Sequence, residues 1–168
     1  MVKDRSAPQQ APLWGISMVE WSLLAGVIVV LALVFARQVR VLQGQAELAA
    51  VQSTLGALRT AMVIDHLHKR VAVGNSSVAS MQRNPFELLQ RHLTNYRGEM
   101  TAVEAALIPA GSWVFDSVCV CIGYRPLYAQ WFYSPSDDVM AWFGVSGALG
   151  PLQLTAKEAY LFQGQVMN

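Results

Sequence analysis

At 168 residues and a formal net charge of +1, the chain has room for one globular domain and a helix, and hardly for two domains. Hydrophobic residues make up 54% of the chain and charged residues 14%, so it is more apolar than an average soluble domain. The nearly neutral balance gives no electrostatic reason to expect nucleic-acid binding.

The first residues differ sharply from those that follow. Lys3, Arg5, Pro8 and Pro12 fall in a stretch without hydrophobic periodicity, which predicts a disordered cytoplasmic leader over residues 1–15. No packed element is expected there.

A long apolar run follows the leader. Ile16 to Ala36 contains 21 residues, and Glu20 is its only charged residue. As a helix this run reaches roughly 31 Å, the thickness of the hydrocarbon core of a bilayer, so it predicts a membrane-spanning helix. A carboxylate in lipid costs at least ~2.5 kcal/mol, and Glu20 is therefore expected to have a cationic partner.

Gly15, the apolar Ile16 directly after it, and Glu20 four residues later form a recognisable pattern. It resembles the processing signal of type IV prepilins and of type II secretion pseudopilins. The resemblance implies that a prepilin peptidase cuts between Gly15 and Ile16, and that the new amine of Ile16 is N-methylated. It also implies that Glu20 compensates such an amine when subunits assemble.

The same resemblance implies a function and a location. The chain would be a structural subunit of a type IV pilus or of a type II secretion pseudopilus, not an enzyme. Its partners would be other pilin or pseudopilin subunits, the prepilin peptidase and the inner-membrane assembly platform. It would first cross the bacterial inner membrane once, with its leader cytoplasmic and its head periplasmic, and then enter the pilus or pseudopilus.

The sequence departs from the family pattern at two positions, of which the first is tolerated within the family and the second favours a minor pilin or pseudopilin. Ile16 stands where the family usually has Phe, and Arg37 stands where many major pilins have a helix-breaking Pro. The two cysteines are too close in sequence to close the C-terminal loop typical of many pilins. Alternatives are an uncleaved signal-anchored protein with a periplasmic partner-binding domain, and a secreted domain released after Ala36.

The helix is expected to continue beyond the membrane as an amphipathic segment over residues 37–74. Its apolar positions recur at spacings of three and four: Leu48, Val51, Leu55, Leu58 and Met62. Gly44 and Gly56 are interpreted as weak points that each cost up to ~1 kcal/mol relative to Ala. Gly74 is the expected end of the helix.

Residues 75–168 are expected to form a globular head. Asn84 and Pro85 predict a short helix that continues through His92, and a further helical turn is expected over 102–107. From residue 112 the period changes to two, which predicts strands over 112–115, 118–124, 127–133, 139–145 and 159–166. The expected class is α+β, pilin-like, with the long helix packed on a C-terminal antiparallel sheet.

Asp65, His66 and His68 are read as a solvated helix end, because neighbours two apart lie on different faces of a helix. Cys119 and Cys121 are expected to be free, partly buried thiols, since regular strand geometry separates their Cα atoms by roughly 6.5 to 7 Å.

Asp137 and Asp138 are read as a solvated hairpin, with calcium as the alternative. The aromatic residues of the last third are expected to fill the core under the helix, with some left for a subunit contact. No motif for catalysis, a metal or a cofactor is found.

Overall fold

The computed structural model describes residues 17–73, 84–105, 107–147 and 153–167. The chain divides into two compact units, Met1–Val41 and Leu42–Asn168. The leader, Gly15, Ile16 and the expected helix end at Gly74 lie outside the described residues.

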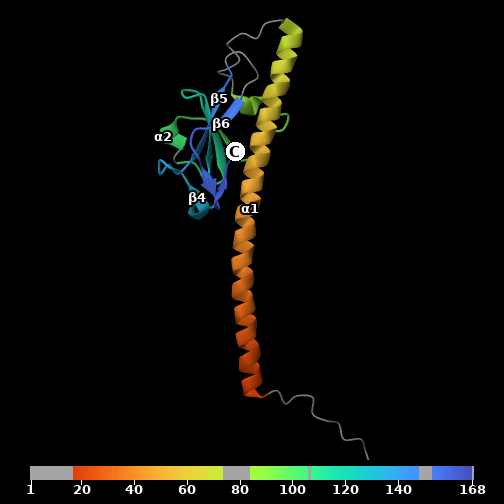
Figure 1. Ribbon diagram of the computed structural model, residues 1–168, viewed down its shortest axis with the longest axis vertical. Helices are drawn as coiled ribbons and strands as arrows, with labels where there is room; N and C mark the ends of the chain where they lie inside the picture. The colour runs from red at the N-terminus through yellow and green to blue at the C-terminus, as the bar shows by residue number, and fades with distance from the viewer. Residues whose placement is uncertain (1–16, 74–83, 106, 148–152, 168) are drawn as a thin grey trace, which may run out of the picture. The chain divides into compact units, whose positions relative to one another are not determined.

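Helix α1 is a single element of 56 residues, Met18–Val73 (Figure 1). The stretch that begins the helix is apolar, and no proline interrupts it, so every interior backbone N–H has an acceptor one turn earlier. The prediction of one long N-terminal helix that does not stop at Arg37 is confirmed.

The part of α1 within the second unit buries one face. The five positions predicted from the spacing are all at most 5% exposed: Leu48, Val51, Leu55, Leu58 and Met62. They share one hydrophobic core with residues of the strands, so this half of the helix packs on the sheet as predicted. Burial of each such side chain contributes about 1.5 to 3 kcal/mol.

The main sheet has five strands in the order β1-β2-β3-β5-β6. These strands are β1 Tyr96–Glu99, β2 Ser112–Asp116, β3 Cys121–Arg125, β5 Ala141–Ser146 and β6 Gln153–Ala156. The pairs β2-β3, β3-β5 and β5-β6 are antiparallel, whereas β1 pairs with β2 in parallel. The α+β class is confirmed, but the sheet is mixed and not wholly antiparallel.

The parallel edge strand arises from a crossover. Between β1 and β2 the chain makes the one-turn helix α2, Ala102–Ala105, which confirms the helical turn expected there. A connection that includes this turn lets β2 run in the same direction as β1. β1 and β6 were both missed from sequence because each has only four residues.

A second, three-stranded sheet has the order β4-β7-β8. It consists of β4 Phe132–Tyr133, β7 Leu161–Phe162 and β8 Gln165–Val166. The expected strand over 127–133 is wrong in its first part, because the 3-10 helix η3, Ala129–Trp131, precedes β4.

The other departures from the expected strands lie at turns. The expected strand over 159–166 is a hairpin, with Gln163 at φ 50° and Gly164 at φ 77° between β7 and β8. Positive φ at both central residues matches the twist of a tight hairpin.

The 3-10 helix η2, Pro85–Leu88, starts where the sequence predicts a helix. The side chain of Asn84 accepts a hydrogen bond of 3.1 Å from the backbone N–H of Phe86. The helix ends at Leu88 and does not reach His92, because Leu89 is already extended.

Aromatic side chains fill the core around Trp113, which is 2% exposed. Its ring lies 4.6 Å from that of Tyr124 and 6.5 Å from that of Phe143, between centroids. Tyr133 is 58% exposed and is the aromatic residue of the predicted set that lies most clearly outside the core. The prediction that most of these aromatics pack under the helix is confirmed.

Candidate functional site

The described part of the first unit begins with a capping box. The backbone N–H of Ser17 donates to Oε2 of Glu20 at 2.7 Å, and the N–H of Glu20 donates to the Ser17 hydroxyl oxygen at 3.3 Å. This reciprocal pair satisfies two N–H groups at the start of a helix. Glu20 therefore has a partner within its own chain, which the sequence reasoning missed although the Ser-x-x-Glu signal was visible.

The apolar side chains of α1 in this unit lie at its surface. Its large side chains from Met18 to Phe35 are more than half exposed. By length and composition this helix can cross a membrane. Glu20 lines an open groove together with Leu23, Leu24, Val27 and Ile28, so its carboxylate borders an otherwise apolar surface.

A buried carboxylate joins α1 to the sheet within the second unit. Glu47 is 7% exposed, and its Oε1 accepts hydrogen bonds from the Tyr124 hydroxyl at 2.8 Å and from the Leu127 N–H at 2.6 Å. Its Oε2 accepts from the Tyr128 N–H at 3.1 Å. Three donors to one carboxylate compensate the loss of water that burial imposes.

Glu47 also affects the chemistry of its partner. Burial, and then the nearby charge of Glu47, raise the pKa of the Tyr124 hydroxyl well above its ordinary value of 10.0. The tyrosine thus remains a donor throughout the physiological range. Sequence reasoning missed Glu47, and its position beside Leu48 in the apolar stripe was the available signal.

Gly44, one turn before Glu47, is buried and lies against the side chains of Trp131 and Gln163. A Cβ atom at this position would overlap both of them. The interpretation of Gly44 as a weak point is therefore wrong, because the absence of a side chain lets the Trp131 ring approach the helix. Gly56 has no atom within 4 Å of the corresponding position, and its interpretation stays a prediction.

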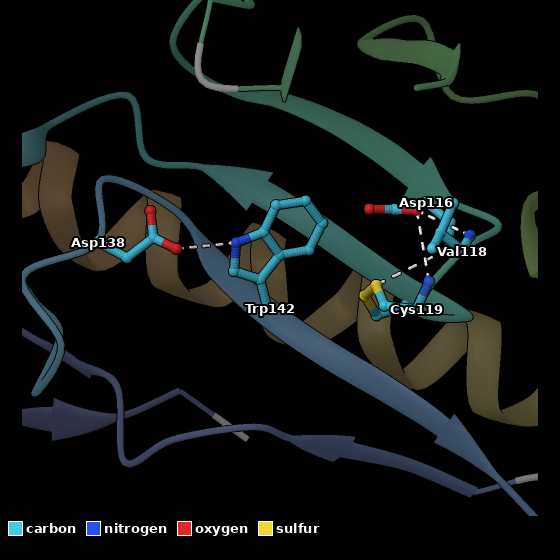
Figure 2. The surroundings of a disulfide bond; sticks show 6 residues. Asp116, Val118, Cys119, Asp138 and Trp142 are labelled. Atoms are coloured by element: carbon cyan, nitrogen blue, oxygen red, sulfur yellow. Dashed lines mark hydrogen bonds between the residues drawn. A yellow bond between two sulfur atoms is a disulfide. The ribbon is translucent and has the colours of Figure 1, made fainter. Parts of the chain in front are cut away.

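The two cysteines form a disulfide in the turn before β3 (Figure 2). The expectation of free thiols is wrong because residues 117–120 form a turn and not a strand. Val120 has φ 51°, and the Cα atoms of Cys119 and Cys121 are 5.3 Å apart. That distance is within the range that a disulfide bridges.

Asp116 fixes the same turn without a covalent bond (Figure 2). Its Oδ1 accepts hydrogen bonds from the Val118 N–H at 2.8 Å and from the Cys119 N–H at 3.4 Å. Its ligand atoms and those of Cys119 and Cys121 lie within 4.8 Å of one another, the one such group among the described residues. Sulfurs joined in a disulfide are not the thiolates that metal ions prefer.

The disulfide contributes little net stability to the fold. Its loop contains a single residue between the cysteines, for which chain-entropy reasoning gives roughly 1.5 kcal/mol. The left-handed conformation of Val120 costs about 1 to 2 kcal/mol in a residue that is not glycine. The two contributions nearly cancel.

The acidic turn after β4 is held by bonds within the chain. Oδ2 of Asp138 accepts from Trp142 Nε1 at 3.0 Å (Figure 2). Its Oδ1 accepts from the Met140 N–H at 3.2 Å. Asp137 has φ 62°, which aspartate tolerates better than most residues. Both carboxylate oxygens of Asp138 thus have structural partners. The hairpin interpretation is wrong, because the turn connects β4 and β5, which belong to different sheets and do not pair with each other.

Glu158 also holds this turn through hydrogen bonds. Its Oε2 accepts from the hydroxyl groups of Ser136 and Ser134 at 2.9 and 3.0 Å. The bond from the Ser136 hydroxyl is the largest of the contributions that lower the pKa of Glu158.

A groove of about 750 Å³ runs along α1 in the second unit. It is lined on one side by helix residues that include Asp65 and His68, and on the other by residues 88–91 and 93. Asp65 pairs with Lys69 at 2.6 Å, one turn later. The interpretation of Asp65, His66 and His68 as a solvated helix end stays a prediction.

Comparisons with protein-family models, with curated proteins and with solved structures found no match. The features that carry functional meaning are therefore those of the chain itself. They are the capped, exposed apolar helix with Glu20 at its start, and the second unit locked to its part of α1 through Gly44 and Glu47.

Proposed function

We propose that the chain is a structural subunit, a minor pilin or pseudopilin, of a type IV pilus or type II secretion pseudopilus. A prepilin peptidase removes residues 1–15, and the helix from Ile16 onward first anchors the subunit in the bacterial inner membrane. The head faces the periplasm. An assembly platform then transfers the helix into a filament of related subunits.

The observation that carries the proposal is the apolar helix bearing one carboxylate at its first turn. From Met18 to Phe35 the large apolar side chains are exposed, and the helix begins two residues after Ile16. A surface this apolar requires lipid or protein around it. Moving it from lipid into a filament core costs little, because both surroundings exclude water.

Glu20 can pair with a neighbouring subunit once the helix is in the filament. Its Oε2 holds the Ser17 N–H, and Oε1 accepts no hydrogen bond from any described residue. Oε1 can therefore receive a second donor, the amine at Ile16 of a neighbouring subunit, while the capping box stays closed. Such a pair compensates a charge that is costly in an apolar medium, and its geometry would set the register between subunits.

Substitutions at two positions separate capping from pairing. Glu20→Gln keeps a side chain that can close the capping box but removes the charge, whereas Ser17→Ala removes the capping hydroxyl and keeps the charge. We expect Glu20→Gln to insert and be cleaved normally but to be lost from sheared filaments, and Ser17→Ala to be incorporated. Normal incorporation of Glu20→Gln would remove the pairing role.

The capping box also favours a second candidate, an uncleaved signal-anchored protein whose periplasmic domain binds a partner. A carboxylate already bonded to the Ser17 N–H costs less in a permanent anchor than a bare one. For such an anchor, Glu20→Gln and Ser17→Ala would change only helix stability, each by about 1 kcal/mol, and no filament would contain the chain.

A further inference from the structure

The two cysteines of the disulfide differ in their exposure to solvent. Cys119 is exposed, whereas Cys121 is 0% exposed and belongs to the core. Thiol–disulfide exchange proceeds by direct attack on a sulfur, so access decides which sulfur an external thiolate reaches. An incoming thiolate can thus reach Cys119 and not Cys121.

The residue between the cysteines is held in an unfavourable conformation. Val120 is β-branched and has φ 51°, a combination that is a genuine outlier in proteins. Its carbonyl oxygen accepts a hydrogen bond of 3.0 Å from the Val145 N–H, and Asp116 holds the preceding residues through its two bonds. These bonds hold the N–H of Cys119 and the carbonyl of Val120, and the disulfide is the further constraint on the backbone dihedrals between those two points. Opening the disulfide removes that constraint, so φ of Val120 can then relax.

We infer that Cys119 is a thiol–disulfide exchange site, and that the left-handed conformation of Val120 makes its bond to Cys121 easier to reduce than a structural disulfide. The reacting partner is a dithiol, either a small molecule or a Cys-x-x-Cys protein. This inference does not depend on whether the chain enters a filament.

The reaction has two steps. A thiolate of the dithiol attacks Sγ of Cys119, a mixed disulfide forms, and the bond to Cys121 breaks with its electron pair on the Cys121 sulfur, which takes a proton. The second thiolate of the dithiol then attacks the first sulfur of the same dithiol, which is bonded to Cys119 in the mixed disulfide. Cys119 leaves with the electron pair of that bond and takes a proton. The protein gains two electrons and two protons, and the dithiol becomes a disulfide.

The surroundings of the disulfide allow its reduction but make the exchange reaction slow. The ligand atoms of Asp116 and of the two cysteines lie within 4.8 Å of one another, so the negative carboxylate repels a thiolate that approaches the disulfide. Sγ of Cys119 lies 3.9 Å from the carbonyl oxygen of Asp116, to which the reduced thiol can donate.

The test uses the full chain in detergent, equilibrated with reduced and oxidised dithiothreitol at varied ratios and then alkylated for mass analysis. Val120→Asn accepts the left-handed conformation more readily, so it should need about 5- to 30-fold more reduced reagent at the midpoint. Val118→Asn, in the same turn but with no positive φ, should shift the midpoint by no more than about twofold. An unchanged midpoint for Val120→Asn, or easier reduction, would overturn the inference.

A second measurement identifies the attacked sulfur. Oxidised glutathione should modify the free thiol of Cys121→Ser, which is Cys119, roughly ten times faster than the free thiol of Cys119→Ser. Equal rates, or a faster reaction at Cys121, would contradict Cys119 as the site. If Cys121→Ser does not fold, the midpoints of the Val120→Asn and Val118→Asn proteins still decide the inference.

Discussion

The Tyr124 hydroxyl donates a hydrogen bond of 2.8 Å to Oε1 of Glu47, across 77 positions of the sequence. This bond connects the end of β3 to α1 within the second unit. The N–H groups of Leu127 and Tyr128 also donate hydrogen bonds to the Glu47 carboxylate. The head is thus fixed to its part of the helix by a buried polar contact as well as by apolar packing. In a filament subunit such a contact would make the position of the head depend on the position of the helix.

Removal of this carboxylate should destabilise the second unit strongly. Glu47→Leu leaves three donors without an acceptor, and each buried group left unsatisfied costs about 1 to 3 kcal/mol. We expect the free energy of unfolding in urea to fall by at least ~2 kcal/mol. Gln45→Leu, an exposed position on the same helix, should change it by less than about 0.5 kcal/mol. Equal behaviour of the two variants would contradict a structural role for Glu47.

Two glycines of α1 should respond in opposite directions to the same substitution. Gly44→Ala introduces a methyl group against Trp131 and should lower the free energy of unfolding by about 1 to 3 kcal/mol. Gly56→Ala meets open space and should raise it by up to ~1 kcal/mol. Thermal unfolding of the two variants side by side measures the difference, and stabilisation by Gly44→Ala would show that the close approach is absent.

Tyr124 should make the fold sensitive to alkali. Its pKa is raised in the folded state, so its contribution to stability is complete below pH 10 and is lost as the pH rises above the unfolded value of 10.0. Between pH 10 and 11.5 the wild type should lose up to ~1.4 kcal/mol per pH unit more than Tyr124→Phe. The raised pKa values of Tyr96 and Tyr160 affect both proteins equally. Parallel curves in urea titrations would refute the shift.

Local periodicity explains what the sequence could predict. The apolar stripe from Leu48 to Met62 identifies the buried face of α1, because helical spacing depends only on neighbouring residues. The capping signal at Asn84 and the helical turn at Ala102 are likewise local. These elements could be read without knowledge of what packs against them.

The rest depended on contacts between distant residues. Nothing near Glu47 in sequence shows that Tyr124 will face it, and the need for glycine at residue 44 comes from Trp131. The disulfide was missed because regular strand geometry was assumed where Val120 turns the chain. For the proposed assembly site, Glu20 could be named from sequence, but its bond to the Ser17 N–H adds a role that the family resemblance does not imply.

The N-terminus of the mature protein tests the proposed function most directly. Intact mass and N-terminal sequencing, on the full chain expressed in a bacterium with a prepilin peptidase, distinguish the three forms of the chain. A filament subunit should begin at an N-methylated Ile16, and Gly15→Val should block that cleavage. A mature chain that still begins at Met1, or one that begins at Arg37 after release of the apolar helix, would contradict the proposed function.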